Sequence, residues 1–292
     1  MVVVYVGAGL ANRMFQYAFA LSLREKGLDV FIDEDSFIPR FDFERTKLDS
    51  VFVNVNIQRC DKNFFPLVLR EDRFYKLLKR ISEYMSDNRY IERWNLDYLP
   101  YIHKKASTNC IFIGFWISYK YFQSSEDAVR KAFTFKPLDS IRNVELATKL
   151  VTENSVAVHF RKNIDYLKNL PNTCPPSYYY EAINYIKKYV PNPKFYFFSD
   201  NWDWVRENIR GVEFTAVDWN PSSGIHSHCD MQLMSLCKHN IIANSTYSWW
   251  SAYLNENNNK IVVCPKKWFN EEMQKYRNIN SLIIPEKWIS LE

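Results

Sequence analysis

The residues best suited to chemistry lie in one stretch of the chain, Ser155 to Tyr166, which reads S-V-A-V-H-F-R-K-N-I-D-Y. Its first half is apolar and β-branched, a pattern that predicts a buried strand. At or beyond the carboxyl end of that strand stand His159, Arg161, Lys162 and Asp165. That edge of an open α/β sheet binds ligands, and an arginine there can hold a phosphate by two parallel hydrogen bonds beside the point charge of a lysine. The alternative interpretation is an ordinary strand followed by a solvated, charged loop.

Polar side chains also end two other strands predicted in the C-terminal half. Ser199 and Asp200 follow an apolar run at residues 194–198. Another set follows residues 241–243 and opens a helix, and it consists of Asn244, Ser245, Thr246 and Ser248. Hydroxyl and backbone N–H groups at a helix N-terminus can hold a phosphate. Because the carboxyl ends of parallel strands meet at one edge of a sheet, these sets and the first stretch together predict a nucleotide site.

A third feature lies near the N-terminus, where a β-branched run at residues 2–6 leads into a turn with Gly7, Gly9 and Asn12 and then into helical spacing. Backbone N–H groups in such a strand–turn–helix unit can face an anion. A tight turn that simply needs glycine explains the pattern equally well. With Asp33 at the end of the next strand, the turn would also suit a dinucleotide-dependent oxidoreductase, although the third glycine of that fingerprint is absent.

These residues need a scaffold to position them, and the C-terminal half has the pattern of one. Helices are predicted at 139–152, 177–189, 203–209 and 230–237, and strands at 155–160, 194–198, 212–217, 241–243 and 261–264. Strands and helices that alternate at short spacing predict a parallel, doubly wound sheet. We therefore expect two α/β domains, residues 1–135 and 136–292, because a second strand–helix series begins after residues 133–138.

Residues 70–93 alternate charged and apolar positions with a helical period. The pattern predicts an amphipathic helix that is mildly basic at its start. Such a helix can touch a membrane or a lipid-borne substrate. The simpler interpretation is a helix that covers one face of a sheet.

Composition narrows the class of protein. Hydrophobic residues make up 47% of the 292 residues, which is enough for substantial cores. The aromatic share of 17% suits a protein that places rings against sugars or bases. The net charge of +5 favours an anionic ligand or an acidic membrane surface without diagnosing either, and we expect no nucleic-acid partner.

The sequence also predicts a cellular compartment. Its 6 cysteines are scattered without zinc-type spacing, which favours reduced thiols in a cytosolic protein. The N-terminus runs directly into a strand, so no signal peptide is expected. No uninterrupted apolar run reaches the roughly 18 residues of a membrane span. A soluble or peripheral protein is expected.

Five segments of the chain form a series in a fixed order. They read G-A-G-L-A-N-R-M-F-Q-Y-A-F-A, G-F-W-I-S-Y-K-Y-F, H-F-R-K-N-I-D-Y, F-F-S-D-N-W-D-W-V-R-E-N and D-M-Q-L-M-S-L-C-K-H-N-I-I-A-N-S-T-Y-S-W-W. Together, over residues 5 to about 269, they resemble the α-1,2-fucosyltransferases of glycosyltransferase family 11. The resemblance implies a GT-B-like fold with two Rossmann-like domains facing a central cleft. It also implies GDP-β-L-fucose as donor, inversion at the anomeric carbon, and no metal or other cofactor.

The resemblance further implies roles for individual residues. His159 and Arg161 match the H-x-R motif of the family, with Arg161 as partner of the donor's β-phosphate. Asp200 would contact the guanine, with Ser199 nearby. The residues implied to touch the diphosphate or the fucose are Asn244, Ser245, Thr246 and Ser248 in the C-terminal domain and Gly7, Gly9 and Asn12 in the N-terminal domain.

Two departures from the family pattern affect these roles. The family usually shows H-x-R-R-x-D, whereas this chain has Lys162 in place of the second arginine and one extra residue before Asp165. Lysine keeps the charge and loses the bidentate geometry. In the opening turn, Ala11 replaces a glycine and Arg13 a glutamine, which changes how that turn approaches a donor.

These roles predict a direct displacement by an acceptor hydroxyl. Arg161, Lys162 and the helix N-terminus at Ser245 would stabilise the departing diphosphate. His159 and Asp165 are the candidates for the base that deprotonates the acceptor. Arg161, His159 and Asp165 are therefore the predicted catalytic residues.

The acceptor is expected to be a galactoside at the end of a lipid-linked surface glycan, as in lipopolysaccharide biosynthesis. The enzyme would then work in the cytoplasm, at the inner face of the membrane, with peripheral membrane contact. Two alternatives stay open beside the oxidoreductase. One is a non-catalytic carbohydrate-binding protein, and the other is the same fold with a different GDP-sugar donor.

Overall fold

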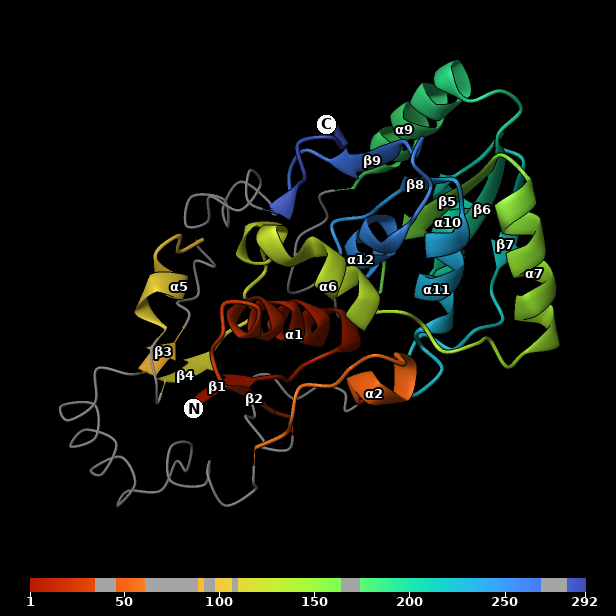
Figure 1. The fold of residues 1–292 in the computed structure, drawn as a ribbon. Helices are drawn as coiled ribbons and strands as arrows, with labels where there is room; N and C mark the ends of the chain where they lie inside the picture. Colours follow the sequence, from red (N-terminus) through yellow and green to blue (C-terminus); the bar gives the residue numbers. More distant parts are fainter. Residues whose placement is uncertain (35–45, 61–88, 92–97, 107–109, 164–173, 269–282) are drawn as a thin grey trace, which may run out of the picture. The chain divides into compact units, whose positions relative to one another are not determined.

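The structure, a computed structural model, describes residues 1–34, 46–60, 89–91, 98–106, 110–163, 174–268 and 283–292. Contacts within the chain divide it into two compact units, Met1–Thr134 and Phe135–Glu292. This division falls one residue before the predicted domain boundary at 135/136. Each unit contains a parallel sheet with helices packed on it (Figure 1). The chain is therefore an α/β protein.

The described part of the first unit holds a four-stranded parallel sheet in the order β2-β1-β4-β3. Its strands are β1 (Val2–Tyr5), β2 (Val30–Asp33), β3 (Arg89–Ile91) and β4 (Cys110–Ile113). The helical segments are α1 (Leu10–Arg24), α2 (Leu48–Val51), α5 (Ile102–Lys105), η1 (Tyr119–Tyr121), η2 (Gln123–Ser125) and α6 (Glu126–Ala132). The chain leaves β1 toward β2 on one side and returns to β4 on the other, so the turn between β1 and α1 lies where the strand order reverses.

The prediction of a helix at residues 70–93 is wrong at its C-terminal end. Residues Arg89–Ile91 form β3, which pairs in parallel with β4. Helical spacing is a local signal, and hydrogen bonding to a strand much later in the chain overrides it here. The rest of that helix, and with it the suggested membrane contact, lies outside the described residues.

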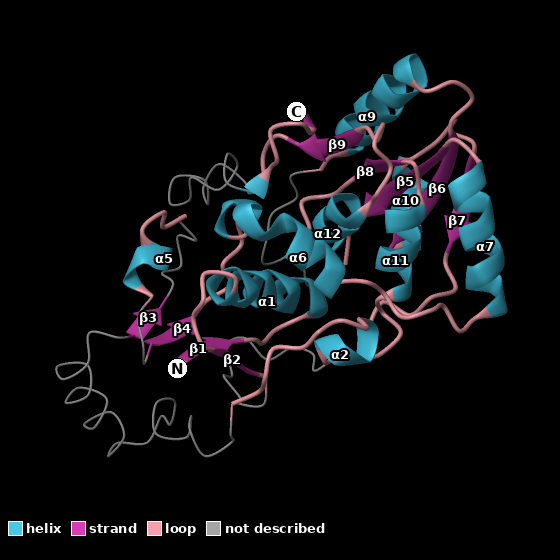
Figure 2. Cartoon of the chain, in the orientation of Figure 1, coloured by secondary structure: helices cyan, strands magenta, loops and turns pink. Residues whose placement is uncertain are grey.

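The second unit holds a six-stranded parallel sheet, counted over the described residues, in the order β10-β9-β8-β5-β6-β7. Its strands are β5 (Ser155–Phe160), β6 (Lys194–Ser199), β7 (Phe214–Val217), β8 (His239–Ile241), β9 (Val262–Pro265) and β10 (Ile289–Leu291). The helices are α7 (Ile141–Thr152), α9 (Pro176–Tyr189), α10 (Trp202–Asn208), α11 (Cys229–Leu236) and α12 (Thr246–Leu254). Figure 2 shows these helices on both sides of the strands. The predicted doubly wound sheet is confirmed.

β5 lies in the middle of this sheet, and all its residues are buried. Val158 and Phe160 point to the core face that α9 and α10 cover. Ala157 points to the opposite face, which α7 and α11 cover. Because side chains alternate along a strand, His159 follows Ala157 on the α7/α11 face. The apolar run therefore fixes the direction of the first predicted site residue.

The order of the strands places a ligand-binding crevice at one point of this sheet. From β5 the chain runs outward through β6 to β7 and then returns to β8, on the other side of β5. In open α/β sheets, ligands bind at the carboxyl ends of the strands where this reversal occurs. Here that point lies between the ends of β5 and β8.

Some boundaries and elements differ from the prediction. β8 begins two residues earlier than the predicted strand at 241–243, so Ala243 and Asn244 belong to the turn that leads into α12. β10 was not predicted from the sequence, because three residues are too short for a periodic signal. No helix in the described part of the chain is long and apolar enough to cross a bilayer.

Candidate active site

His159 lies near the carboxyl end of β5 and is almost fully buried, with 5% of its surface exposed. Its ring packs against Tyr247, with 5.7 Å between the ring centroids. Its Nδ1 atom has no hydrogen-bond partner among the described residues. Burial, and after it the neighbouring charge of Arg161, lower the pKa of His159 to about 3. The imidazole is therefore neutral at physiological pH.

Arg161 begins the loop just beyond β5, and about a third of its side chain is exposed. Its guanidinium Nη1 lies 2.9 Å from Oδ2 of Asp200, which follows β6. β5 and β6 are neighbours in the sheet, so the pairing of the two strands brings these residues together. An arginine held on one side by a carboxylate can still present its other N–H groups to an anion.

Asp200 contacts both Arg161 and Lys162, the two cationic residues that follow β5. Its Oδ1 accepts the backbone N–H of Lys162 at 2.6 Å, while Oδ2 faces Arg161. Ser199, before it, accepts the backbone N–H of Asn201 through its hydroxyl at 3.0 Å. The Asp200 carboxylate thus stabilises the loop that follows β5. A contact between Asp200 and a guanine stays a prediction.

Lys162 does not point along the same edge. Its side chain is buried, and Nζ donates to the carbonyl oxygen of Cys174 at 2.6 Å. Nζ also lies 4.4 Å from the centre of the Trp204 ring. Burial lowers the pKa of Lys162 to about 8. The predicted phosphate contact of this ammonium is untested, and in the structure it binds protein groups.

The second set of predicted residues lies between β8 and α12. Ser245 is the N-cap of α12, and its hydroxyl accepts the backbone N–H of Tyr247 at 3.3 Å. Asn244 is buried, and its amide donates to the carbonyl of Trp268 at 3.2 Å. Ser248 is fully buried, and its hydroxyl lies within 3.4 Å of the carbonyl oxygens of Ala243 and Ser245, to which it can donate a hydrogen bond. Ser248 therefore stabilises the turn, whereas the N-terminus of α12 is the part of this set suited to an anion.

Thr246 is the first residue of α12 and is partly exposed. Asp165, the remaining catalytic candidate, lies outside the described residues.

Two residues beside this edge received no role in the sequence analysis. The Tyr247 hydroxyl donates to the carbonyl of Ser227 at 2.5 Å and accepts the backbone N–H of Met231 at 2.8 Å. Asp230, at the start of α11, accepts a hydrogen bond from the Asn220 amide at 2.8 Å, and burial raises the pKa of its carboxyl to about 7. An acid in the first turn of a helix is common, so only its burial distinguishes Asp230.

In the first unit, hydrogen bonds through Gln16 hold the turn at Gly7 in place. The Gly7 N–H donates to Oε1 of Gln16 at 2.8 Å, and Gln16 donates in turn to the carbonyl of Gly114. A Cβ on Gly7 would lie 2.2 Å from the Tyr5 hydroxyl, so a larger residue at this position would have to displace the buried Tyr5 ring. A Cβ on Gly9 would meet nothing within 4 Å, which leaves room for a ligand there.

Arg13 and the acids near it support this turn from within. Arg13 is buried, its Nε donates to the carbonyl of Ala8 at 2.7 Å, and it pairs with Glu34 at 3.7 Å. Asn12 donates its backbone N–H to the carbonyl of Gly9. The substitution at Arg13 noted in the sequence therefore acts on the shape of the turn.

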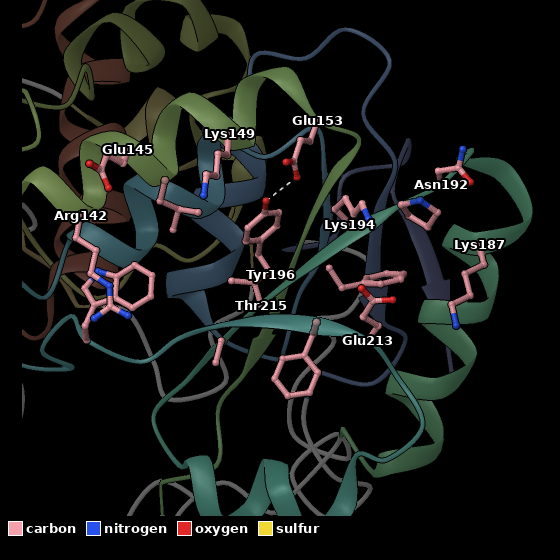
Figure 3. Close-up of a pocket in the computed structure, with 16 residues that line it drawn as sticks. Arg142, Glu145, Lys149, Glu153, Lys187, Asn192, Lys194, Tyr196, Glu213 and Thr215 are labelled. Atoms are coloured by element: carbon pink, nitrogen blue, oxygen red, sulfur yellow. Dashed lines mark hydrogen bonds between the residues drawn. The ribbon is translucent and has the colours of Figure 1, made fainter.

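A separate depression lies in the second unit, with a cavity volume of about 900 Å³ (Figure 3). It lies along α7 and the starts of β6 and β7, and the Tyr196 hydroxyl donates to Glu153 beside it at 2.7 Å. Because the strands start there, it is at the opposite end of the sheet from Arg161 and Asp200. None of the predicted site residues lines it.

The fold is that of a two-unit α/β protein, with a partly exposed arginine and a helix N-terminus at the carboxyl edge of its second sheet. The sequence profile of Glycosyl transferase family 11 matches residues 1–292. The chain belongs to this family of glycosyltransferases.

Two relatives from Escherichia coli extend over nearly the whole chain. An alpha-1,2-colitosyltransferase is 29% identical over 306 residues, covering 100% of this chain and 99% of the relative. The O-antigen biosynthesis glycosyltransferase WbnK is 29% identical over 313 residues, covering 98% and 99%. Among solved structures, the fucosyltransferase NodZ from Bradyrhizobium shares the fold, with a TM-score of 0.51, 17% identity, and coverage of 86% of this chain and 91% of NodZ. The predicted GT-B-like α/β class is therefore confirmed. Membership of the family removes the support for the oxidoreductase and for the non-catalytic binding protein.

Proposed function

We propose that this glycosyltransferase transfers L-fucose from GDP-β-L-fucose to the 2-hydroxyl of a terminal galactoside in a surface glycan, with inversion at the anomeric carbon and without a metal ion. The observation that carries the proposal is the Arg161–Asp200 pair at the carboxyl edge of the second sheet. On that edge the N-terminus of α12 follows β8, the other neighbour of β5. A diphosphate can be neutralised by a guanidinium and a helix N-terminus together.

Two relatives support this choice of substrates. NodZ, whose fold the chain shares, is known from crystals soaked with GDP-fucose. WbnK is named for O-antigen biosynthesis, which agrees with a surface-glycan acceptor. A lipid-linked acceptor would place the enzyme at the inner face of the membrane.

The reaction needs no covalent intermediate. The acceptor oxygen attacks the anomeric carbon, and the bond from that carbon to the β-phosphate oxygen breaks with its electron pair leaving on GDP. The acceptor proton passes to a base or to solvent. Arg161 and the N–H groups at the start of α12 stabilise the charge that develops on the diphosphate, which is the main catalytic requirement of a loose transition state.

His159 is poorly suited to act as the base. A general base is effective when its pKa lies near the working pH, whereas burial lowers the pKa of His159 to about 3. Its neutral ring and its Nδ1 atom suit a hydrogen bond to the donor better. Asp165 stays the other candidate for the base.

A different donor is the second candidate function. The colitosyltransferase is 29% identical over the whole chain, and colitose differs from L-fucose by the loss of one hydroxyl group. A site built to hydrogen-bond that hydroxyl would reject colitose, whereas an apolar site would discriminate weakly.

The test is a transfer assay with purified protein and GDP-L-fucose, GDP-colitose or GDP-mannose, with lactose as acceptor and with or without EDTA. We expect fucose transfer that survives EDTA. Arg161→Ala should lower the transfer rate by roughly 100-fold or more in protein that remains folded, because one transition-state contact of this kind contributes about 3 kcal/mol. Arg206→Ala is the matched control, since Arg206 is an exposed arginine on α10.

Each other outcome has a distinct meaning. Preference for GDP-colitose would show that colitose is the transferred sugar, and it would leave the proposed diphosphate site unchanged. Loss of transfer with EDTA would overturn the metal-free mechanism. Equal activity of the Arg161 and Arg206 variants would overturn the proposed diphosphate site.

A further inference from the structure

Lys162 is a buried cation at the edge of the proposed donor site, with 1% of its surface exposed. Its ammonium lies 2.6 Å from the carbonyl oxygen of Cys174 and 4.4 Å from the centre of the Trp204 ring. Burying a charge is costly unless hydrogen bonds and opposite or aromatic partners compensate it. Here the carbonyl, the ring and the nearby Asp200 carboxylate all compensate the ammonium. The cation is therefore held by protein groups.

The backbone of Lys162 is tied to the next strand on both sides. Its N–H donates to Asp200 at 2.6 Å, and its carbonyl accepts from the Asn201 amide at 3.0 Å. Asn201 also caps α10 by accepting the backbone N–H of Trp204, whose ring lies near the Lys162 ammonium. These contacts join the end of β5 to the end of β6. They also hold Asp200 in the position from which it pairs with Arg161.

The contact between Lys162 and Cys174 extends this link to the turn that follows β8. The Cys174 thiol donates to Oδ1 of Asn244 at 3.3 Å, and Asn244 immediately precedes Ser245, the N-cap of α12. One side chain therefore connects the loop that carries Arg161 with the turn that opens α12. These are the two elements proposed to hold the diphosphate.

We propose that Lys162 is a positioning residue, whose ammonium holds the start of α12 against the loop that carries Arg161, through Cys174 and Asn244. The bond from its backbone N–H to Asp200 does not depend on the side chain. The inference rests on the proposed function of this edge. It assigns no contact between the Lys162 ammonium and the donor, so Lys162 acts only through the residues that it holds.

The test compares Lys162→Met, which keeps the length of the side chain without its hydrogen-bond donor, with Lys162→Gln, which keeps a donor without the charge. The first readout is the rate at which a maleimide labels Cys174, followed by peptide mass spectrometry. Cys237 is the internal control, because it is equally buried and belongs to the core on the other face of the sheet. This readout needs neither donor nor acceptor, so it stays valid if the proposed substrates are wrong.

We expect Lys162→Met to raise the labelling rate of Cys174 at least tenfold relative to Cys237. In the transfer assay it should lower kcat and raise the KM for the donor, and Lys162→Gln should restore part of both. Unchanged protection of Cys174 with a raised donor KM would overturn the proposal in favour of a direct phosphate contact. Equal exposure of both cysteines in the Met and Gln variants would also overturn it, because Lys162 would then serve general stability.

Discussion

The guanidinium of Arg161 lies 2.9 Å from a carboxylate oxygen of Asp200, across the carboxyl ends of two neighbouring strands. The carboxylate is nearly buried and the guanidinium is partly exposed. The acid therefore belongs to the framework, and the arginine is the member of the pair that a ligand can reach. In the proposed function, the acid therefore positions the arginine and the arginine binds the diphosphate.

Asp200→Asn should keep the hydrogen bond from the Lys162 N–H and lose the ion pair with Arg161. We expect kcat/KM for the donor to fall roughly 3–10-fold, because an ion pair with a partly exposed guanidinium contributes about 1 kcal/mol. Steady-state kinetics at varied donor concentration measure the effect. Asp203→Asn, at an exposed acid on α10, is the control, and an equal effect of the two variants would contradict the assigned role.

His159 should stay neutral throughout the range in which histidine usually titrates. Burial lowers its pKa to about 3, from about 6.5 in an unfolded chain. Between those values the unfolded state binds more protons, so this residue makes the folded protein less stable as pH falls from 6.5 toward 3. NMR spectra of the ring nitrogens should show no titration of His159 between pH 5 and 8 in the folded protein and normal titration in denaturant. A midpoint near pH 6.5 in the folded protein would restore His159 as a candidate base.

Asp230 should make stability depend on pH in the opposite direction. Burial raises the pKa of its carboxyl to about 7, so between about pH 4 and 7 the folded state binds more protons than the unfolded state. Its contribution to stability therefore falls as pH rises through this window. We therefore compare the unfolding free energy of Asp230→Asn with that of the wild type at pH 4 and at pH 8. The difference should shift in favour of the variant by roughly 1–4 kcal/mol from pH 4 to pH 8.

Urea unfolding at the two pH values measures this difference. Asp139→Asn, at an exposed acid, corrects for the general effect of removing a carboxylate. A difference between Asp230→Asn and the wild type that does not change with pH would show that the Asp230 carboxyl is ionised in the fold.

The two glycines of the first turn should respond differently to alanine. Gly7→Ala forces a Cβ against the Tyr5 side chain, and overpacking of this kind costs about 1–3 kcal/mol of unfolding free energy. Gly9→Ala meets no neighbour and has a backbone φ of −67°, so stability should be unchanged. If the donor approaches the turn there, Gly9→Ala should still raise the donor KM. Denaturant unfolding and kinetics on both variants check the contrast, and a destabilised Gly9 variant would contradict it.

The sequence by itself determined the alternation of strands and helices. The apolar runs at β1, β5 and β6 and the helical periods of α7 and α9 are local signals, and the structure places these elements within two residues of the predicted bounds. The class of fold followed, because short alternating elements have few ways to bury their apolar faces. The positions of Arg161 and Asp200 at strand ends were visible for the same reason.

The tertiary structure alone decided what those residues contact. Residues 89–91 became a strand by pairing with β4, although their local pattern was helical. Lys162 and Arg161 are adjacent cations in the sequence, yet one is buried against Cys174 and the other is partly exposed beside Asp200. Asp230 resembles an ordinary acid at a helix start, and only its packed environment raises the pKa of its carboxyl. Strand pairing and the contacts of a side chain depend on residues far apart in the chain, so local spacing alone does not determine them.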